Sequence, residues 1–197
     1  MAINTTVQEN KSAQTRQVIL ESAIELFLKY GIKRVTIDDI CNNCNLTKGS
    51  FYHHFPTKDH IVTLSINSGL DKYVENKYVN DTKLNLCQQI TNLNLCAFEY
   101  FKGIGKEMTR EAYVSMINSS VDVRIEGRIY VDYLTSIIRQ VNECNIALAD
   151  FNFNEAYIHS ISVFTGIIMK WSTSIDVPYD DVNWENLIKQ QFKIMFK

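Results

Sequence analysis

Helix-breaking residues are scarce in this chain, and their scarcity limits the folds open to it. The 197 residues include 2 prolines and 7 glycines, the residue types that most disfavour a helix interior. Hydrophobic residues make up 46% and charged residues 21% of the sequence, a balance typical of folded chains. The composition therefore predicts an all-α fold.

The first periodic stretch covers residues 15–30. Its apolar side chains recur at helical spacing, at Ile19, Ala23, Leu26, Phe27 and Tyr30. Gly31 follows, at the place where a helix end often needs left-handed backbone. Residues 1–11 are polar, which predicts a frayed arm and not the apolar segment of a signal peptide. The periodicity therefore predicts a first helix over residues 15–30. The lack of a signal-peptide pattern leads us to expect a cytoplasmic location.

Two short helices are predicted next. Thr36, with Asp39 three places later, is typical of a capped helix start. Asn45 suits the end of that helix because Asn tolerates left-handed backbone. Thr47 can cap a third helix, which Pro56 limits because a residue before proline disfavours helical geometry.

The rest of the chain is predicted to form longer amphipathic helices, giving about nine in all. We expect them at residues 57–79, 82–102, 106–119, 127–146, 153–174 and 182–196. The breaks contain Gly103, Gly105, Asn152 and Pro178. We expect a front domain at 1–60 and a back domain at 61–197.

Two short helices joined by a tight turn have the shape that enters a DNA major groove. Thr47, Lys48 and Ser50 lie at the start of the second of these helices, where side chains meet base edges, and Gly49 allows close approach. Tyr52 and His53 can donate hydrogen bonds to phosphates.

The same region carries side chains with other expected roles. Thr36 and Lys58 begin the flanking helices and are expected to contact phosphates. Phe51 and Phe55 are expected to pack against the first helix. The sequence thus predicts a DNA-binding surface built mainly from the third helix.

Residues 36–59 resemble the helix-turn-helix of TetR-type repressors. The matching residues are Thr36, Ile40, Gly49, Tyr52, Phe55 and Lys58, with Thr47 and Leu46 in place of the usual Ser and Val. Ala23, Phe27 and Gly31 also fit the first helix of that family. Cys41 and Cys44 replace small alanines, and Asn45 replaces the turn glycine.

The resemblance implies a division of labour between the two parts of the chain. The front helices would bind a palindromic operator in double-stranded DNA as part of a homodimer. The back helices would bind a small-molecule effector of unknown identity, which shifts the fourth helix and releases the operator. The alternative is a ligand-independent or partner-recruiting regulator with a solid helical core.

Candidate residues for the back domain come from central or apolar helix positions. The candidates for ligand binding are Phe98, Phe101, Tyr113, Met116, Tyr133, His159 and Phe164. The candidates for the dimer interface, on the last two helices, are Ile158, Ile161, Thr165, Ile168, Leu187, Ile188, Gln191 and Met195.

Several other function classes are disfavoured. The net charge is -2, and residues 1–60 carry seven basic and six acidic side chains, so charge alone does not indicate DNA binding. The five cysteines are interpreted as free thiols, with Cys41 and Cys44 in the core and no metal site. No catalytic motif, cofactor motif or membrane-length apolar run is present in the sequence, so we expect a soluble non-enzyme without a cofactor.

Overall fold

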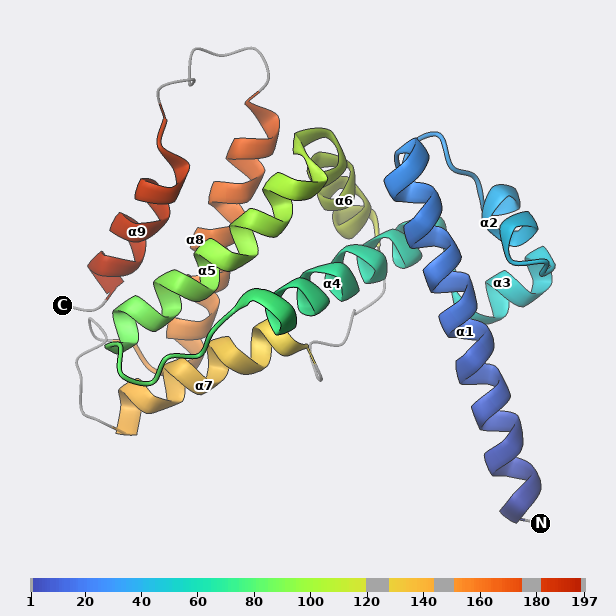
Figure 1. The fold of residues 1–197 in the computed structure, drawn as a ribbon, viewed down its shortest axis with the longest axis horizontal. Helices are drawn as coiled ribbons and strands as arrows, with labels where there is room; N and C mark the ends of the chain where they lie inside the picture. The colour runs from blue at the N-terminus through green and yellow to red at the C-terminus, as the bar shows by residue number, and fades with distance from the viewer. Residues whose placement is uncertain (1, 120–127, 144–150, 175–181, 196–197) are drawn as a thin grey trace. The chain divides into compact units, whose positions relative to one another are not determined.

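The computed structural model describes residues 2–119, 128–143, 151–174 and 182–195, with the side chains of 2–9, 141–143 and 194–195 left aside. Every regular element in these ranges is an α-helix (Figure 1). The helices are α1 (Ala2–Tyr30), α2 (Ile37–Asn43), α3 (Lys48–His54), α4 (Lys58–Lys77), α5 (Leu86–Ile104), α6 (Lys106–Asn118), α7 (Ile129–Glu143), α8 (Phe153–Thr173) and α9 (Trp184–Met195). The predicted all-α class is confirmed. None of the helices in the described ranges combines the length and apolar character that a membrane span requires.

The chain divides into two compact units. The first comprises Met1–Asn67 and Glu111–Val123, and the second comprises Ser68–Arg110 and Arg124–Lys197. Helices α4 and α6 therefore contribute residues to both units. A functional boundary at residue 60 stays a prediction, and the packing adds part of α6 to the first unit.

The first unit is built on α1, with α2 against it and α3 against α2. Ile19, Ala23 and Phe27 of α1 are buried, as the periodicity predicts, and α2 buries Ile40. Tyr30 departs from the prediction: it is 49% exposed, because α1 ends at this residue and its ring lies outside the packed face.

A buried hydrogen bond fixes α2 on α1. The Ser22 hydroxyl donates to the carbonyl of Ile40 at 3.2 Å, and the Asn43 amide donates to the Ser22 hydroxyl at 3.0 Å. Because buried polar groups are costly when unpaired, these bonds specify how the two helices dock. The sequence alone does not reveal this polar contact.

The second unit is built around α5, which packs against α7, α8 and α9. Ile90, Leu93, Leu134 and Ile138 are fully buried. Polar groups also pair in this core, where the Tyr130 hydroxyl donates to the Asn94 Oδ1 at 2.8 Å.

Most predicted helices are confirmed, with shifts at their ends. The first helix begins at Ala2, so the expected frayed arm at residues 1–11 is wrong over the described residues; the segment holds no Gly or Pro to stop a helix. Gly103 lies inside α5, and the helix ends at Gly105, whose φ of 85° is left-handed. The predicted break at Asn152 is confirmed, because Asn152 is the N-cap residue of α8. Pro178 lies outside the described residues.

Candidate nucleic-acid interface

The start of each short helix is fixed by a side-chain cap. The Thr36 hydroxyl accepts from the Asp39 amide at 3.1 Å, and the Asp39 carboxylate accepts from the Thr36 amide at 2.8 Å, a complete capping box. The Thr47 hydroxyl accepts from the Ser50 amide at 3.1 Å. These bonds satisfy backbone donors that would otherwise lack partners at the helix start. Both predicted caps are confirmed.

The turn between α2 and α3 is closed by its own backbone. Asn45 has a φ of 54°, the left-handed conformation that the sequence predicts. The Leu46 amide donates to the Cys41 carbonyl at 2.9 Å, and the Asn45 amide donates to the Asn42 carbonyl at 3.3 Å. This pair of bonds is a Schellman motif, which ends α2 and turns the chain directly into α3.

Helix α3 buries one face and exposes the other. Phe51, within the helix, and Phe55, its C-cap, are both fully buried, and the Arg16 guanidinium of α1 lies 5.1 Å from the Phe55 ring centre. This confirms the predicted packing role of the two phenylalanines. Tyr52 is 52% exposed, and His53 lies on the same solvent side.

The remaining predicted DNA-contacting residues lie at the first turn of α3 and at the neighbouring helix starts. Thr47, Lys48 and Gly49 are exposed, and Ser50 is half-buried. Thr36 is exposed at the start of α2, next to its capping partner. The structure therefore places these groups where a duplex can reach them.

Lysines gather on this side of the first unit. A surface pocket of about 370 Å³ is lined by Lys33, Val35, Thr36, Ile37, Asp38, Lys48, Tyr52 and Lys58. The Lys48 ammonium lies 2.8 Å from a carboxylate oxygen of Asp38, and this hydrogen bond raises the pKa of Lys48. The side chains that line this pocket include three lysines and one aspartate, so the set carries a net positive charge.

The Lys58 side chain is partly buried and already hydrogen-bonded within the protein, unlike a fully exposed lysine. Its ammonium donates to the Ile32 carbonyl at 2.6 Å, and burial lowers the pKa of Lys58. Lys33 pairs with Glu111 of α6 at 2.6 Å within the first unit. Asp38 and Lys33 are members of this pocket that sequence reasoning missed, because their neighbours come from different helices.

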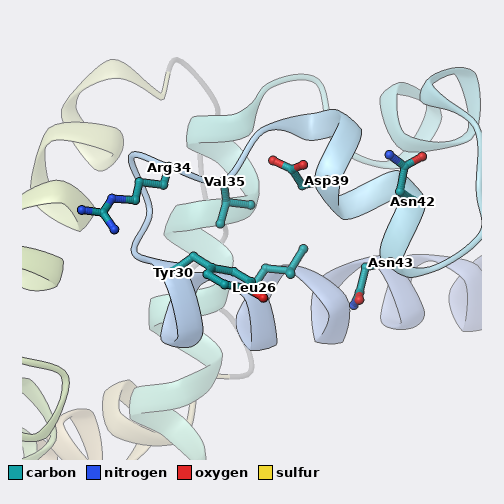
Figure 2. A pocket seen from close by; sticks show the side chains of 7 residues that line it. All are labelled: Leu26, Tyr30, Arg34, Val35, Asp39, Asn42 and Asn43. Atoms are coloured by element: carbon teal, nitrogen blue, oxygen red, sulfur yellow. The ribbon is translucent and has the colours of Figure 1, made fainter.

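A second cavity, of about 590 Å³, lies beside α1, α2 and the segment that joins them (Figure 2). Its lining residues are Leu26, Tyr30, Arg34, Val35, Asp39, Asn42 and Asn43. Figure 2 shows the Arg34 guanidinium pointing away from the other labelled side chains. None of the residues that line this cavity belongs to α3, and Val35 also lines the smaller lysine-rich pocket.

Comparison with known proteins identifies this segment. Residues 19–63 match the family described as bacterial regulatory proteins, tetR family. This segment is therefore similar to the tetR-family domain. The domain spans the end of α1, both short helices and the start of α4, which are the elements that form the surface described above.

Curated relatives match the chain over part of their length. The repressor KstR2 of Mycolicibacterium smegmatis is 29% identical over 92 residues, covering 46% of this chain and 44% of the relative. The Staphylococcus aureus regulator IcaR, described as a negative transcriptional regulator of the biofilm operon icaADBC, is 31% identical over 112 residues, covering 57% and 58%. The chain thus spans less than two thirds of the length of these relatives.

Solved structures extend the likeness to the whole fold. A TetR transcriptional regulator from Rhodococcus sp. RHA1 superposes with a TM-score of 0.66 at 15% identity, covering 93% of this chain and 95% of that one. FadR from Bacillus subtilis, in complex with stearoyl-CoA, gives 0.63 at 12% identity, covering 92% and 97%. At these identities the likeness establishes a shared fold.

The candidate ligand-binding residues belong to both units. Phe98, Phe101 and Phe164 are buried in the second unit, where Phe98 packs on Trp171 with ring centres 5.4 Å apart. Phe101 and Phe164 lie 6.3 Å apart. Each of these three rings packs on another aromatic ring, so they contribute to a packed core.

The other four candidates differ in their surroundings. Tyr133 is half-buried against Tyr78, and His159 is half-buried with its ring 5.0 Å from that of Phe151. Tyr113 is half-buried in the first unit, on α6. Met116, also on α6, is 45% exposed, so it lies on the surface of its own unit, and its role in ligand binding stays a prediction.

The candidate dimer residues divide by exposure. Ile158 is 60% exposed, and Ile161, Thr165, Leu187 and Gln191 are half-buried. Ile168 and Ile188 are fully buried within their own unit, where α8 and α9 pack on α5, so their assignment to a subunit surface is wrong. The side chain of Met195 lies outside the described residues.

The thiols and imidazoles show no ligand arrangement in the described ranges. Cys41, Cys44, Cys87 and Cys96 are free, with Cys41 buried, and Cys144 lies outside the described residues. No group of three His, Cys, Asp or Glu side chains within the described part of the chain is placed to hold a metal ion.

Proposed function

We propose that this protein is a DNA-binding transcriptional regulator that reads its operator with α3. The observation that carries the proposal is the exposed first turn and outer face of α3, which present Lys48 and Tyr52 above a buried Phe51 and Phe55. A rigid helix with polar groups at its N-terminal end is the form in which helix-turn-helix proteins contact base edges. Repression is the mode in which the named relatives act, and we extend it to this chain.

The test is DNA binding by matched variants. A labelled duplex that covers the region beside the protein's own gene is titrated with wild type, Lys48→Ala and Tyr52→Ala. We expect each variant to weaken binding at least tenfold. Lys29→Ala and Tyr30→Ala are controls of the same residue types at the exposed end of α1, and they should bind as wild type does. Equal binding by all five proteins at low salt would refute the proposal.

We further propose that the protein acts as a homodimer through α8 and α9. A groove of about 300 Å³ between these helices is lined by residues that include Val163, Gly166, Ile167 and Leu187. Figure 1 shows the two helices side by side. Ile158 and Met169 add exposed apolar area on α8. Such a face suits an isologous contact between two copies, and a two-fold dimer would match a palindromic operator.

Light scattering tests the dimer. The chain has a mass of 22.8 kDa, so a dimer doubles that value. Ile158→Asp and Met169→Asp place a charge on the proposed face and should yield monomers. Val114→Asp, at an exposed apolar side chain of α6, is the matched control and should leave the mass unchanged. A monomeric wild type would contradict this part of the proposal.

We propose that a small organic molecule bound in the second unit releases the operator. FadR is described in complex with stearoyl-CoA, and another fold neighbour, RolR, in complex with resorcinol. In this chain, the buried Nδ1 of His159 and Oε1 of Gln89 find no hydrogen-bond partner among the described residues. Unpaired buried polar atoms are candidates for contacts with a ligand.

The alternative is a regulator that needs no ligand. The ring contacts of Phe98 with Trp171 and of Phe101 with Phe164 favour it, because buried rings that pack on one another leave less room for a ligand. Native mass spectrometry of protein purified from cells separates the two candidates. A mass increment that is lost on denaturation supports the effector, and a bare chain that still represses its operator supports the alternative.

A further inference from the structure

Asp38 is the one carboxylate among the residues that line the lysine-rich pocket on the α2–α3 side of the first unit. It lies in the first turn of α2, and its oxygen is 2.8 Å from the ammonium of Lys48 in the first turn of α3. The side chains of Asp38 and Lys48 are 58% and 60% exposed. An acidic group therefore stands on the surface that a polyanion must approach.

The other two lysines of the pocket have partners of a different kind. Lys33 pairs with Glu111 of α6, and Lys58 donates to a backbone carbonyl. Only the Lys48–Asp38 pair joins two exposed side chains of the helix-turn-helix itself. A solvent-exposed ion pair of this kind contributes little to folding stability. Any functional effect of the Lys48–Asp38 ion pair therefore lies in how Lys48 contacts DNA.

Asp38 affects two classes of DNA complex differently. In a non-specific complex the protein binds phosphates, so Lys48 must give up its ion pair with Asp38 before it can bind a phosphate. In a specific complex the ammonium of Lys48 donates to a guanine edge, and a carboxylate beside it can accept from a cytosine amino group. The pair then presents a donor and an acceptor together, and the ion pair need not break.

We propose that Asp38 is a specificity-determining residue that weakens non-specific DNA binding by competing with phosphate for Lys48. The inference rests on the proposed DNA-binding function. It predicts that loss of the carboxylate gives tighter binding to arbitrary DNA with little gain at the operator. Asp38 sets the ratio of operator affinity to non-specific affinity, and it leaves the operator affinity itself nearly unchanged.

The experiment uses the full chain and two duplexes. One duplex is selected by the wild-type protein from a random pool, and the other is a shuffled duplex of the same composition. For Asp38→Asn we expect three- to tenfold tighter binding to the shuffled duplex and less than twofold change on the selected one. The slope of log affinity against log salt concentration for the shuffled duplex should steepen by about 0.9, the value for one added phosphate contact.

Two further variants make the test decisive. Glu21→Gln removes the same charge from the exposed face of α1, where the carboxylate accepts from Gln17, and should change neither affinity nor slope. In a Lys48→Ala background, Asp38→Asn should have no effect on the shuffled duplex. An equal gain on both duplexes, an equal effect of Glu21→Gln, or an effect that persists without Lys48 would overturn the inference. A wild type that prefers neither duplex would overturn the proposed DNA-binding function as well as the inference about Asp38. That outcome differs from those above, which overturn the inference alone.

Discussion

Thr36 and Asp39 hold one another across the first turn of α2. The Thr36 hydroxyl donates to Asp39 Oδ2 at 2.7 Å, in addition to the two backbone bonds of the capping box. The hydrogen bonds from Thr36 lower the pKa of Asp39. The residue expected to meet a phosphate is therefore also the residue that fixes where α2 begins.

Thr36→Ala should lower the free energy of unfolding by about 0.5–2 kcal/mol, the usual range for loss of an N-cap. Thr36→Ser keeps the hydroxyl and should stay close to wild type. Urea unfolding followed by circular dichroism measures both. Equal losses for the two variants would show that the methyl group, and not the cap, carries the stability.

The turn residue Asn45 gives a second test. Its left-handed φ of 54° costs a residue with a β-carbon about 1–2 kcal/mol, and Asn and Gly tolerate it better. We expect Asn45→Ala to be destabilised by about 1 kcal/mol and Asn45→Gly to be near wild type. Asn42→Ala, at an exposed site of α2, is the control and should change the unfolding free energy by less than about 0.5 kcal/mol. A tolerated Asn45→Ala would contradict the strained turn.

His60 predicts a loss of stability in mild acid. Its Nδ1 is buried and has no hydrogen-bond partner among the described residues, and burial, then the charge of Arg16, lowers its pKa. An unfolded histidine titrates near pH 6.5, so the two states bind protons equally above that value. As the pH falls below about 6.5, the unfolded state takes up the proton first, and stability declines until the folded state also titrates.

The measurement is the unfolding free energy of wild type and His60→Leu between pH 7.5 and 5. The unfolding free energy of His60→Leu should fall less over this range than that of wild type. Adding His54→Gln should reduce the fall further, since burial also lowers the pKa of His54. If the pH dependence of His60→Leu matched that of wild type, His60 would not be its source.

Gly69 of α4 leaves room for the Tyr100 hydroxyl. A β-carbon at position 69 would overlap the end of that side chain. Gly69→Ala gains about 1 kcal/mol of helix propensity and loses about 1–3 kcal/mol to overpacking, so we expect no net gain or a loss. In a Tyr100→Phe background the hydroxyl contact is lost while two ring atoms remain 3.1 and 3.2 Å from the added β-carbon, so the same substitution should be less destabilising than in wild type. Thermal unfolding of the four proteins of this cycle tests the coupling, and additive effects would contradict it.

The sequence could predict those parts of the fold that have a local cause. Thr36, Thr47 and Asn45 set helix ends through hydrogen bonds to backbone groups three residues away, and all three act as predicted. The start of α1 could not be predicted, because periodicity detects only helical turns that bury apolar side chains. Ile168 and Ile188 were assigned to a surface because an apolar stripe is the same whether it faces its own core or a partner.

The candidate site shows the same limit. Lys48 and Tyr52 could be predicted because both lie on one short helix with a recognisable start. Asp38 could not, because its partner is ten residues away and only the Schellman turn brings the two together. Ser22 was missed for a related reason, since a buried hydroxyl that joins two helices has no periodic signature.

The central claim is that α3 reads DNA, and selection of duplexes from a random pool tests it most directly. We predict that the wild-type protein enriches a two-fold symmetric sequence whose half-sites lie about one helical turn apart or a multiple of it. The Lys48→Ala, Tyr52→Ala double variant should lose that enrichment. A wild type that enriches no sequence, or a double variant that enriches the same one, would contradict the account.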